Sequence, residues 1–414
     1  MLRKIYLLPV IAITSSILLG GYILEDLGVP YVSQGGSPFF KIHLYSYLIV
    51  MGFGLVFLSN GIKGISLRLG SYYRFWMIAF SCNVFVILYG FAIHGSSGMA
   101  YLVNTFLAPV LIVPLLACLN DNQKSFLLKL IAYLILLNSL VAVMEFILHF
   151  RLVKVDFQEF SFFRSTAFLT HPLNNALITV SVALLVANKT KFPGFVYMLI
   201  VALALFAFGG RAALAIFICA VSVSFAPMLW KAITQGISGN KQKIALYMLI
   251  GYFSFWGGAY LLFESGITER ITSKLYIDGS ASARLDVFYL IDQLSVREWM
   301  FGASHRLIDS IELYIGINVI ENYLIGWIFT FGIVGTIPLF LVVYAPLTYF
   351  SITGNLIERM SVFSFIVISI TNNSMTTKTP ALLLLFTCLY LSKSLRERLS
   401  APQYSQLNLG NPDA

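Results

Sequence analysis

Apolar segments of about 20 residues recur along the whole chain, and they constrain its fold more than any other feature of the sequence. Each is long enough to cross the hydrocarbon core of a bilayer, which is about 30 Å thick. In lipid every backbone N–H and C=O must be hydrogen-bonded within the protein, so these segments must be helical. Only 11% of the residues are charged, against about 25% in a soluble domain. The sequence therefore predicts an all-α polytopic integral membrane protein.

We expect about twelve transmembrane helices, with eleven as the alternative, in a single domain that covers residues 1–414. The last apolar stretch, 361–391, is interrupted by the polar residues 371–378 and is interpreted as two tilted or half-spanning helices; one broken helix is the alternative. The tail 401–414 is polar and rich in Pro and Gly, which predicts disorder. The expected spans are 5–24, 44–60, 75–94, 101–119, 126–149, 167–188, 193–209, 211–229, 244–263, 322–345 and the two halves of 361–391.

The distribution of Lys and Arg predicts the orientation. With the N-terminus in the cytoplasm, the cytoplasmic segments carry 16 of the 27 basic residues, and five of the remaining 11 lie in one long loop that the rule discounts. Both termini are then cytoplasmic, and the long loop, 264–321, faces outward. The sixteen are Arg3, Lys4, Lys63, Arg68, Arg74, Lys124, Lys129, Lys189, Lys191, Lys231, Lys241, Lys243, Arg359, Lys393, Arg396 and Arg398.

The net charge of +9 is mostly a consequence of this topology. No basic stripe is interleaved with stacking aromatic residues, so nucleic acid is not an expected partner. The four cysteines lie in apolar spans at unrelated spacings, which favours inert packing residues over a metal site.

Polar groups that could carry chemistry collect on the expected outward side. All five histidines, His43, His94, His149, His171 and His305, map there, either as residues that interfacial helix ends tolerate or as part of a polar cavity. In the long loop, Val287, Phe288, Ile291 and Leu294 fall at helical spacing, which predicts a short amphipathic helix on the bilayer surface.

Three arginines on that side are candidates for binding a phosphate group. Arg164 opens the segment that runs to Asn175, Arg211 follows two glycines between apolar spans, and Arg284 follows a run of small residues in the loop. An arginine inside a membrane is costly, so Arg211 should lie at a helix break or face a polar cavity, unless it snorkels to the interface. Guanidinium groups bind phosphate in bidentate fashion, and three together would suit a diphosphate.

Glu321 stands where the long loop meets the next apolar span. A carboxylate there is favoured by the helix dipole and could simply cap the helix. It could also act as a general base or hydroxyl acceptor at the membrane surface. Glu321 and Asn322 are followed, after nine residues, by Gly332 and Gly335.

This pattern resembles the O-antigen polymerase and O-antigen ligase family, the Wzy-like membrane glycosyltransferases of bacterial polysaccharide assembly. The ligase motif has His, then Asn, Ser or Gln, nine residues, Gly, two residues, and Gly, Thr or Tyr. Here Glu321 replaces the His, while Asn322, Gly332 and Gly335 keep the spacing. His171-Pro172-Leu173-Asn174 and Gly209-Gly210-Arg211 resemble two further family segments. The similarity is clearest over about 165–335, and the missing His favours the polymerase branch.

The resemblance implies a GT-C-like fold of about a dozen helices with one large periplasmic loop, in the bacterial inner membrane. It implies that a glycan on an undecaprenyl diphosphate carrier is transferred to the terminal sugar hydroxyl of another carrier-linked repeat. Arg164, Arg211 and Arg284 would hold the leaving diphosphate, and Glu321 or His171 would accept or position the hydroxyl proton. Asn322, Gly332 and Gly335 would support them, without a metal or other cofactor. A chain-length regulator and a flippase are the expected partners.

Four alternatives remain open at this stage. The first is a ligase that transfers the glycan to a different acceptor. The second is a metal-dependent glycosyltransferase that uses Glu25 and Asp26. The third is a transporter or exporter, for which the hints are Asn83, Asn138 and the break at Asn372-Asn373. The fourth is a structural partner in a polysaccharide assembly machine.

Overall fold

A computed structural model describes residues 5–33, 37–95, 98–153, 163–169, 171–236, 291–304, 307, 320 and 322–400. Within these ranges every regular element is a helix. Three helical stretches among the described residues are long and apolar enough to cross a membrane, namely Leu44–His94, Asp121–Leu148 and Tyr323–Thr353. The prediction of an all-helical protein is therefore confirmed for these residues, and the three apolar stretches are compatible with the predicted membrane protein.

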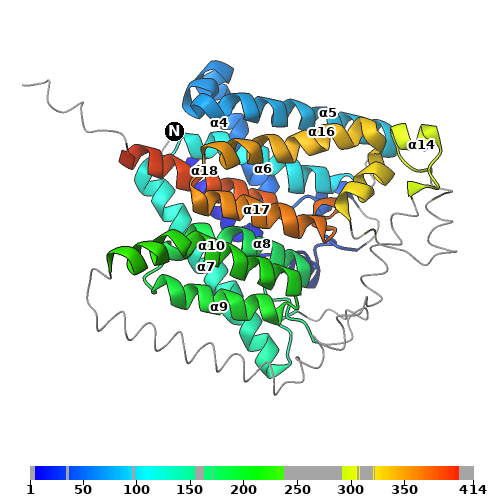
Figure 1. The fold of residues 1–414 in the computed structure, drawn as a ribbon. Helices are drawn as coiled ribbons and strands as arrows, with labels where there is room; N and C mark the ends of the chain where they lie inside the picture. Colours follow the sequence, from blue (N-terminus) through cyan, green and yellow to red (C-terminus); the bar gives the residue numbers. More distant parts are fainter. Residues whose placement is uncertain are drawn as a thin grey trace, which may run out of the picture.

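The helices run roughly side by side in one bundle (Figure 1). The elements are α2 (Leu7–Leu18), α3 (Gly21–Asp26), η1 (Pro38–Lys41), α4 (Leu44–Leu69), η2 (Gly70–Tyr72), α5 (Tyr73–His94), η3 (Leu102–Leu107), α6 (Ala108–Ala117), α7 (Asp121–Leu148), α8 (Pro172–Val186), η4 (Ala187–Lys189), α9 (Gly194–Ala207), α10 (Arg211–Gln235), α14 (Val296–Phe301), α16 (Tyr323–Thr353), α17 (Leu356–Ile370), η5 (Ser374–Thr376) and α18 (Ala381–Ser400).

The bundle has two distinct ends. At one end, which we call the terminal end, the ring of Tyr6 lies 6.0 Å from that of Phe126, and Arg398 forms an ion pair with Asp121. These contacts bring the start of α2 and the last turns of α18 to the start of α7. The opposite end carries α14, at the right of Figure 1, and we call it the α14 end.

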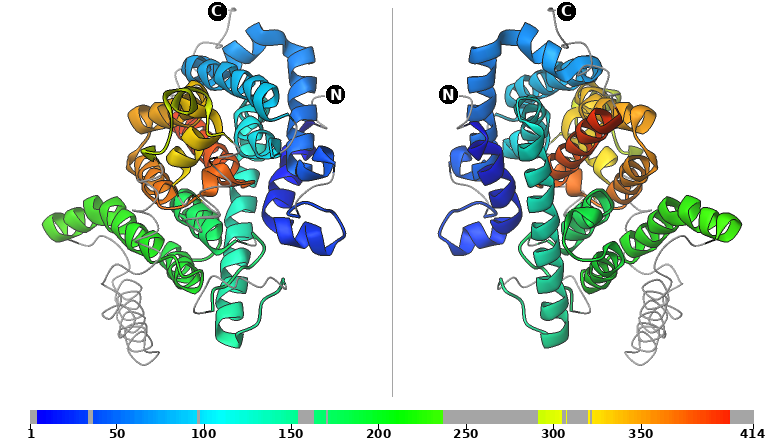
Figure 2. Two further views of the ribbon diagram at one scale, coloured as in Figure 1. Left: turned by 90° about the vertical axis from the view of Figure 1, so that its right-hand side faces the viewer. Right: turned by 90° about the vertical axis from the view of Figure 1, so that its left-hand side faces the viewer.

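α7 is the longest helix without a kink among the described helices, and it packs against α2, α8, α9 and α18. It begins with a capping box, in which the Asn120 side chain accepts from the Gln123 N–H and the Gln123 side chain accepts from the Asn120 N–H. Figure 2, which views the molecule along the bundle, shows that α10 extends away from the other helices.

The first two expected spans have different boundaries in the structure. The first, 5–24, is broken at Leu19-Gly20, because Gly20 has an extended backbone with ψ of 162° between α2 and α3. The second, 44–60, continues to Leu69 through a kink at Gly61, where φ is +60°. Only glycine adopts such a backbone without strain, so the helical stretch changes direction there.

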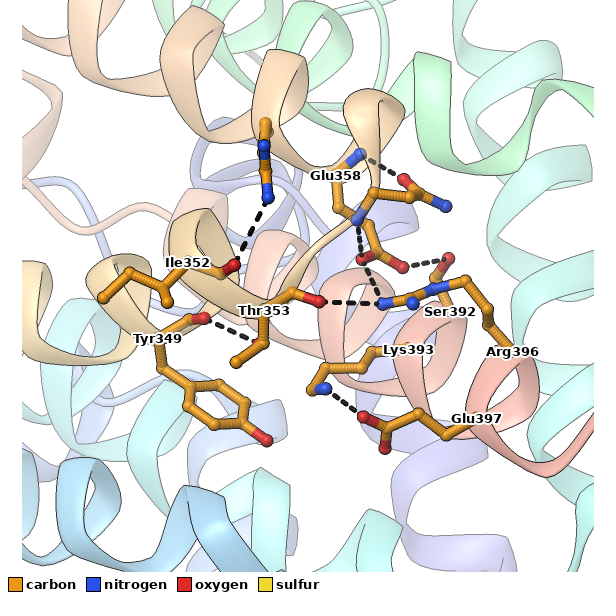
Figure 3. A network of polar contacts seen from close by, with 10 residues as sticks. Tyr349, Ile352, Thr353, Glu358, Ser392, Lys393, Arg396 and Glu397 are labelled. Carbon is orange, nitrogen blue, oxygen red and sulfur yellow. Dashed lines mark hydrogen bonds and ion pairs between the residues drawn. The ribbon is translucent and has the colours of Figure 1, made fainter. Parts of the chain in front are cut away.

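The last apolar stretch forms two helices, α17 and α18, as the preferred interpretation had it. A polar network joins them to α16 at the terminal end (Figure 3). The fully buried Glu358 forms a 2.9 Å ion pair with Arg396 and accepts a hydrogen bond from Ser392. Arg396 also donates to the carbonyl of Thr353, the last residue of α16. One carboxylate thus ties three helices together.

Candidate functional site

A cavity of about 820 Å³ lies at the α14 end of the bundle. Its walls come from segments that are far apart in the sequence: the end of α2, the connection before α4, the start of η3, the start of α8 and the connection between α17 and α18. Polar residues make up much of the lining. They include Tyr31, Lys41, His43, His171, Asn174, Asn373, Thr376, Thr377 and Lys378.

One side of the cavity is held by Asn104, which lies in the π-helical turn η3. Its side-chain oxygen accepts from the N–H of His43 at 2.9 Å, and its amide donates to the carbonyl of Lys41 at 2.9 Å and to the Tyr31 hydroxyl at 3.3 Å. The residue is completely buried. Isolated π turns inside helices are frequent at functional sites, because they re-aim side chains.

The next residue, Thr105, holds the opposite side. Its hydroxyl donates to the carbonyl of Thr377 at 2.7 Å and accepts from the N–H of Thr379 at 3.1 Å. The indole N–H of Trp327 donates to the carbonyl of Met375 at 3.1 Å. These bonds pair backbone groups of the connection between α17 and α18, which contains η5 and could not otherwise be buried.

Each of these two sides presents a lysine to the cavity. Lys41 donates to the carbonyl of Ser33, and Lys378 donates to the carbonyl of Tyr31 and lies 4.2 Å from the centre of its ring. Burial, together with the charge of Lys41, lowers the pKa of Lys378 to about 8. Neither lysine forms an ion pair with a described residue.

His171 lies in the cavity wall directly before α8, as its N-cap residue. Burial and the nearby charge of Arg164 lower its pKa to about 4. The imidazole is therefore neutral at pH 7 and can accept a hydrogen bond from a hydroxyl group. Such a low pKa suits a residue that positions a hydroxyl better than one that takes up its proton.

The expected span 167–188 was wrong at its start, because α8 begins only at Pro172. The chain before it is irregular, with Ala167 at a φ of +43°. Glu145 of α7 explains this course: its carboxylate accepts from the N–H groups of Thr166 and Ala167 at 2.7 and 2.9 Å. The proline ring at 172 also disfavours a helical conformation at the residue before it.

A second amide contact fixes the same segment to α7. Asn138 donates to Asn175 at 2.9 Å and accepts from the N–H of Phe168 at 3.1 Å, and Asn175 donates to the carbonyl of Thr166 at 2.6 Å. Asn138 was a hint of a transporter in the sequence. In the structure it lies about two helical turns before Glu145 on α7 and helps to hold the backbone that carries Arg164 and His171.

Arg164 lies against Gly209, two residues before Arg211 in the sequence. A Cβ atom added to Gly209, whose φ is +71°, would lie 3.0 Å from Nε of Arg164. Arg211 is the first residue of α10, two positions later, and its side chain is exposed. Gly209 therefore supplies both the turn that starts α10 and the space that Arg164 occupies. The structure brings Arg164, His171 and the start of α10 into one region.

The glycines of the Asn322–Gly335 motif have a clear packing role. Gly332 interrupts α16 with a φ of +60°, and an added Cβ would lie 2.3 Å from the carbonyl of Met300 in α14. An added Cβ at Gly335 would lie 2.4 Å from Cβ of Phe331. Asn322 caps α16, accepting from the N–H groups of Leu324 and Ile325. The motif thus lets α14 lie directly on a kinked α16.

The kink also frees three carbonyls of α16, and each finds a donor. The N–H of Ala303 donates to Phe329, the ring of His94 bonds Thr330, and the Tyr89 hydroxyl donates to Phe331, at 2.7, 2.7 and 3.1 Å. α14 itself begins with a capping box formed by Ser295 and Glu298. Hydroxyl hydrogen bonds from Ser304 and Ser295 lower the pKa of Glu298 to about 2.

Three histidines of the outward set have structural roles. His43 caps α4: its Nδ1 accepts from the N–H of Tyr45, and its Nε2 donates to the carbonyl of Leu19 at 2.7 Å. His94 bonds α16 as described, and His149 ends α7 in the left-handed conformation at φ of +50°. His171, the fourth described histidine, precedes α8 and lies in the cavity wall.

Two cavity-shaping charges, Glu145 and Lys378, were missed by the sequence reasoning. Each is an ionisable residue within an otherwise apolar stretch, which is a signal for function in a membrane protein. The outward carboxylates considered were those of loops, so Glu145 inside the span 126–149 escaped notice. The break at 371–378 was weighed as a topological feature and, through Asn372-Asn373, as a hint of a transporter, whereas Lys378 was not considered.

Several predicted residues fall outside the described ranges. They are Arg284, Glu321, His305 and most of the loop 264–321, together with the span 244–263 and the tail 401–414. Of the expected amphipathic helix, Ile291 and Leu294 are described, and both pack in a cluster with Ile325 and Phe329.

The alternative metal site at Glu25 and Asp26 has no arrangement of metal ligands among the described residues. The carboxylate of Glu25 accepts from the N–H of Val32 at 2.6 Å, a bond that lowers its pKa, and so it shapes the chain before η1. Among the described residues no group of three or more His, Cys, Asp or Glu side chains is placed to hold a metal ion.

No protein-family model matches the chain, and no curated protein matches it.

Proposed function

We propose that the protein is a glycosyltransferase that joins carrier-linked oligosaccharide repeats into a polysaccharide at the outer face of the bacterial inner membrane. The observation that carries the proposal is the polar cavity at the α14 end, which has His171 in its wall and Arg164 beside it. A lipid-linked diphosphate needs cations close to the membrane, and its sugar needs a polar space of this size.

In the proposed reaction the terminal sugar hydroxyl of the acceptor attacks the anomeric carbon of the donor. The bond from that carbon to the carrier diphosphate breaks, and the hydroxyl proton passes to a base. Arg164, Arg211 and Arg284 would stabilise the charge that develops on the diphosphate. Glu321 would accept the proton, and the neutral His171 would orient the hydroxyl. The activated leaving group supplies the driving force.

The proposal includes the finer topology. Twelve crossings in a GT-C-like arrangement, with both termini in the cytoplasm, would place the terminal end of the bundle inside and the cavity outside. The cluster of basic residues at that end, among them Lys124, Arg359 and Arg398, supports this orientation by the positive-inside rule. A flippase would then deliver the substrate, and a chain-length regulator would act on the product.

The test is genetic. The gene is deleted, the glycan on the lipid carrier is analysed, and the strain is complemented with wild type, Glu321→Ala or Arg284→Ala. Accumulation of single repeats that wild type relieves and both variants leave in place is the expected result. Long polymer that stays on the carrier would instead identify a ligase. Unchanged polymer length and attachment would contradict the glycosyltransferase proposal and favour a transporter.

A further inference from the structure

The cavity contains a cationic pair, Lys41 and Lys378, that the proposed reaction does not use. The two side chains come from segments more than 300 residues apart, the connection before α4 and that between α17 and α18. Adjacent residues of one π-helical turn hold both segments: Asn104 binds the carbonyl of Lys41, and Thr105 binds Thr377 and Thr379 on either side of Lys378. The fold therefore fixes the backbone segments that carry the two lysines relative to each other.

Like charges in one cavity are unfavourable unless an anion offsets them. The charge of Lys41 acts on Lys378, and in the described chain neither residue has a carboxylate in ion-pair contact. Glu25 lies close enough to counteract part of this repulsion, but its carboxylate accepts backbone N–H groups of Val32 and Ser33 and does not line the cavity. The cavity thus keeps an excess of positive charge.

Both ammonium groups also keep hydrogen-bonding capacity for a ligand. A lysine has three N–H donors. Lys378 uses a donor on the carbonyl of Tyr31, and Lys41 uses its donors on the carbonyl and hydroxyl oxygens of Ser33. An oxyanion with several acceptor oxygens is the ligand class that matches two such groups.

We propose that Lys41 and Lys378 form an anion subsite of the cavity, and that it takes the diphosphate of a second carrier-linked substrate. The inference rests on the proposed function, because a reaction that joins two carrier-linked glycans brings two diphosphates to one site. Lys41 and Lys378 line the cavity on the segments that Asn104 and Thr105 hold, whereas Arg164 packs against Gly209 before α10, so the cationic groups form two sets. One set would serve the donor and the other the acceptor.

The test measures binding to the full-length protein in lipid nanodiscs. Inorganic pyrophosphate is titrated by calorimetry, and undecaprenyl diphosphate incorporated in the nanodisc serves as the second ligand. Lys41→Gln and Lys378→Gln are each expected to weaken pyrophosphate binding about tenfold, since each removes one charge-assisted contact. Lys378→Arg should bind nearly as wild type. Lys129→Gln, which removes an exposed lysine of α7, is the matched control and should change nothing.

Competition separates the two sources of the anion. If undecaprenyl diphosphate displaces pyrophosphate from wild type, the ligand is lipid-borne; displacement by free phosphate alone would overturn the assignment to a carrier substrate. Wild-type affinity in both Gln variants, or an equal loss in Lys129→Gln, would overturn the subsite itself. Thermal unfolding without ligand shows that each variant is folded.

The assay needs no glycosyl transfer, so the two proposals can fail separately. Loss of binding in Lys378→Gln, in a strain whose polysaccharide does not depend on the gene, would retain the subsite and reject the polymerase. Unchanged binding in that variant, in a strain that does depend on the gene, would reject the subsite alone.

Discussion

The carboxylate of Glu145 accepts a 2.7 Å hydrogen bond from the backbone N–H of Thr166, 21 residues further along the chain. It also accepts from the N–H groups of Ala167 and Leu152, and it is almost completely buried. This one side chain therefore fixes the irregular segment that carries Arg164 and His171.

Glu145→Ala should lower the free energy of unfolding by about 3 kcal/mol or more, because three backbone donors lose their acceptor inside the protein. It should also abolish the proposed transfer, since Arg164 and His171 would lose their common support. Thermal unfolding in detergent checks the first effect. The control is Glu397→Gln, which breaks a more exposed ion pair with Lys393 and should cost less than about 1 kcal/mol. Equal effects of the two changes would contradict the assigned role.

Gly332→Ala should displace α14 from α16. The new Cβ would meet the carbonyl group of Met300, and the backbone at φ of +60° is strained for alanine, so the combined cost is about 3 kcal/mol or more. Gly54→Ala is the matched control, because nothing lies within 4 Å of a Cβ at that helical position. Limited proteolysis around α14 measures the displacement; comparable cleavage of both variants would show that the close contact is unimportant.

His171 and His43 should respond differently to the same substitution. His171→Ala should reduce the proposed transfer about 10- to 100-fold while the protein remains folded, because a hydrogen bond to the acceptor hydroxyl is lost. His171→Gln, which retains a hydrogen-bond acceptor, should recover part of the rate. His43→Ala removes the cap of α4 and should instead lower the unfolding temperature. A rate that depends on His43 but not on His171 would reverse this assignment.

Binding of pyrophosphate should depend on pH through Lys378. Its pKa is lowered to about 8 by burial and by Lys41, so the ammonium form is present below pH 8 and is lost as the pH rises above it. Between pH 7 and 9 the affinity of wild type should fall about fivefold relative to Lys378→Arg, whose guanidinium remains charged. The ionisation of pyrophosphate itself is common to both proteins and cancels in the ratio. A constant ratio would show that Lys378 does not contact the anion.

Glu358→Gln should destabilise the terminal end without affecting the cavity (Figure 3). The buried carboxylate pairs with Arg396, whose side chain is 36% exposed, so solvent reduces the cost of losing the pair to about 2 kcal/mol. Pyrophosphate affinity, measured at a temperature where the variant is folded, should equal that of wild type. A weakened affinity would indicate coupling between the two ends of the bundle.

The sequence predicted the helices well where burial in lipid alone decides the structure. Long apolar segments such as Asp121–Leu148 and Tyr323–Thr353 must be helical wherever they occur, so their pattern suffices. The resemblance singled out Gly332 and Gly335 as supporting residues, and the structure gives Gly332 a packing role that the sequence did not predict, the close approach of Met300.

The segment before α8 could not be predicted in this way. Residues 167–171 are apolar enough to continue the helix. However, the N–H groups of Thr166 and Ala167 donate to the carboxylate of Glu145 and not to backbone carbonyls of a helix. That interaction joins residues more than 20 positions apart, and no local pattern records it. The cavity could not be predicted for the same reason. The segments that carry Lys41 and Lys378 are held together by hydrogen bonds of Asn104 and Thr105, which are distant from both lysines in the sequence.

The most direct measurement is reconstitution of the purified protein in liposomes with carrier-linked repeats of the source polysaccharide. Gel analysis of the lipid-linked glycan should show a ladder of longer chains, with release of free undecaprenyl diphosphate in equal amount to the bonds formed. Arg164→Gln and His171→Ala should slow the ladder, and Lys129→Gln should not. Single repeats that stay unchanged in the presence of folded wild-type protein would contradict the proposed polymerase.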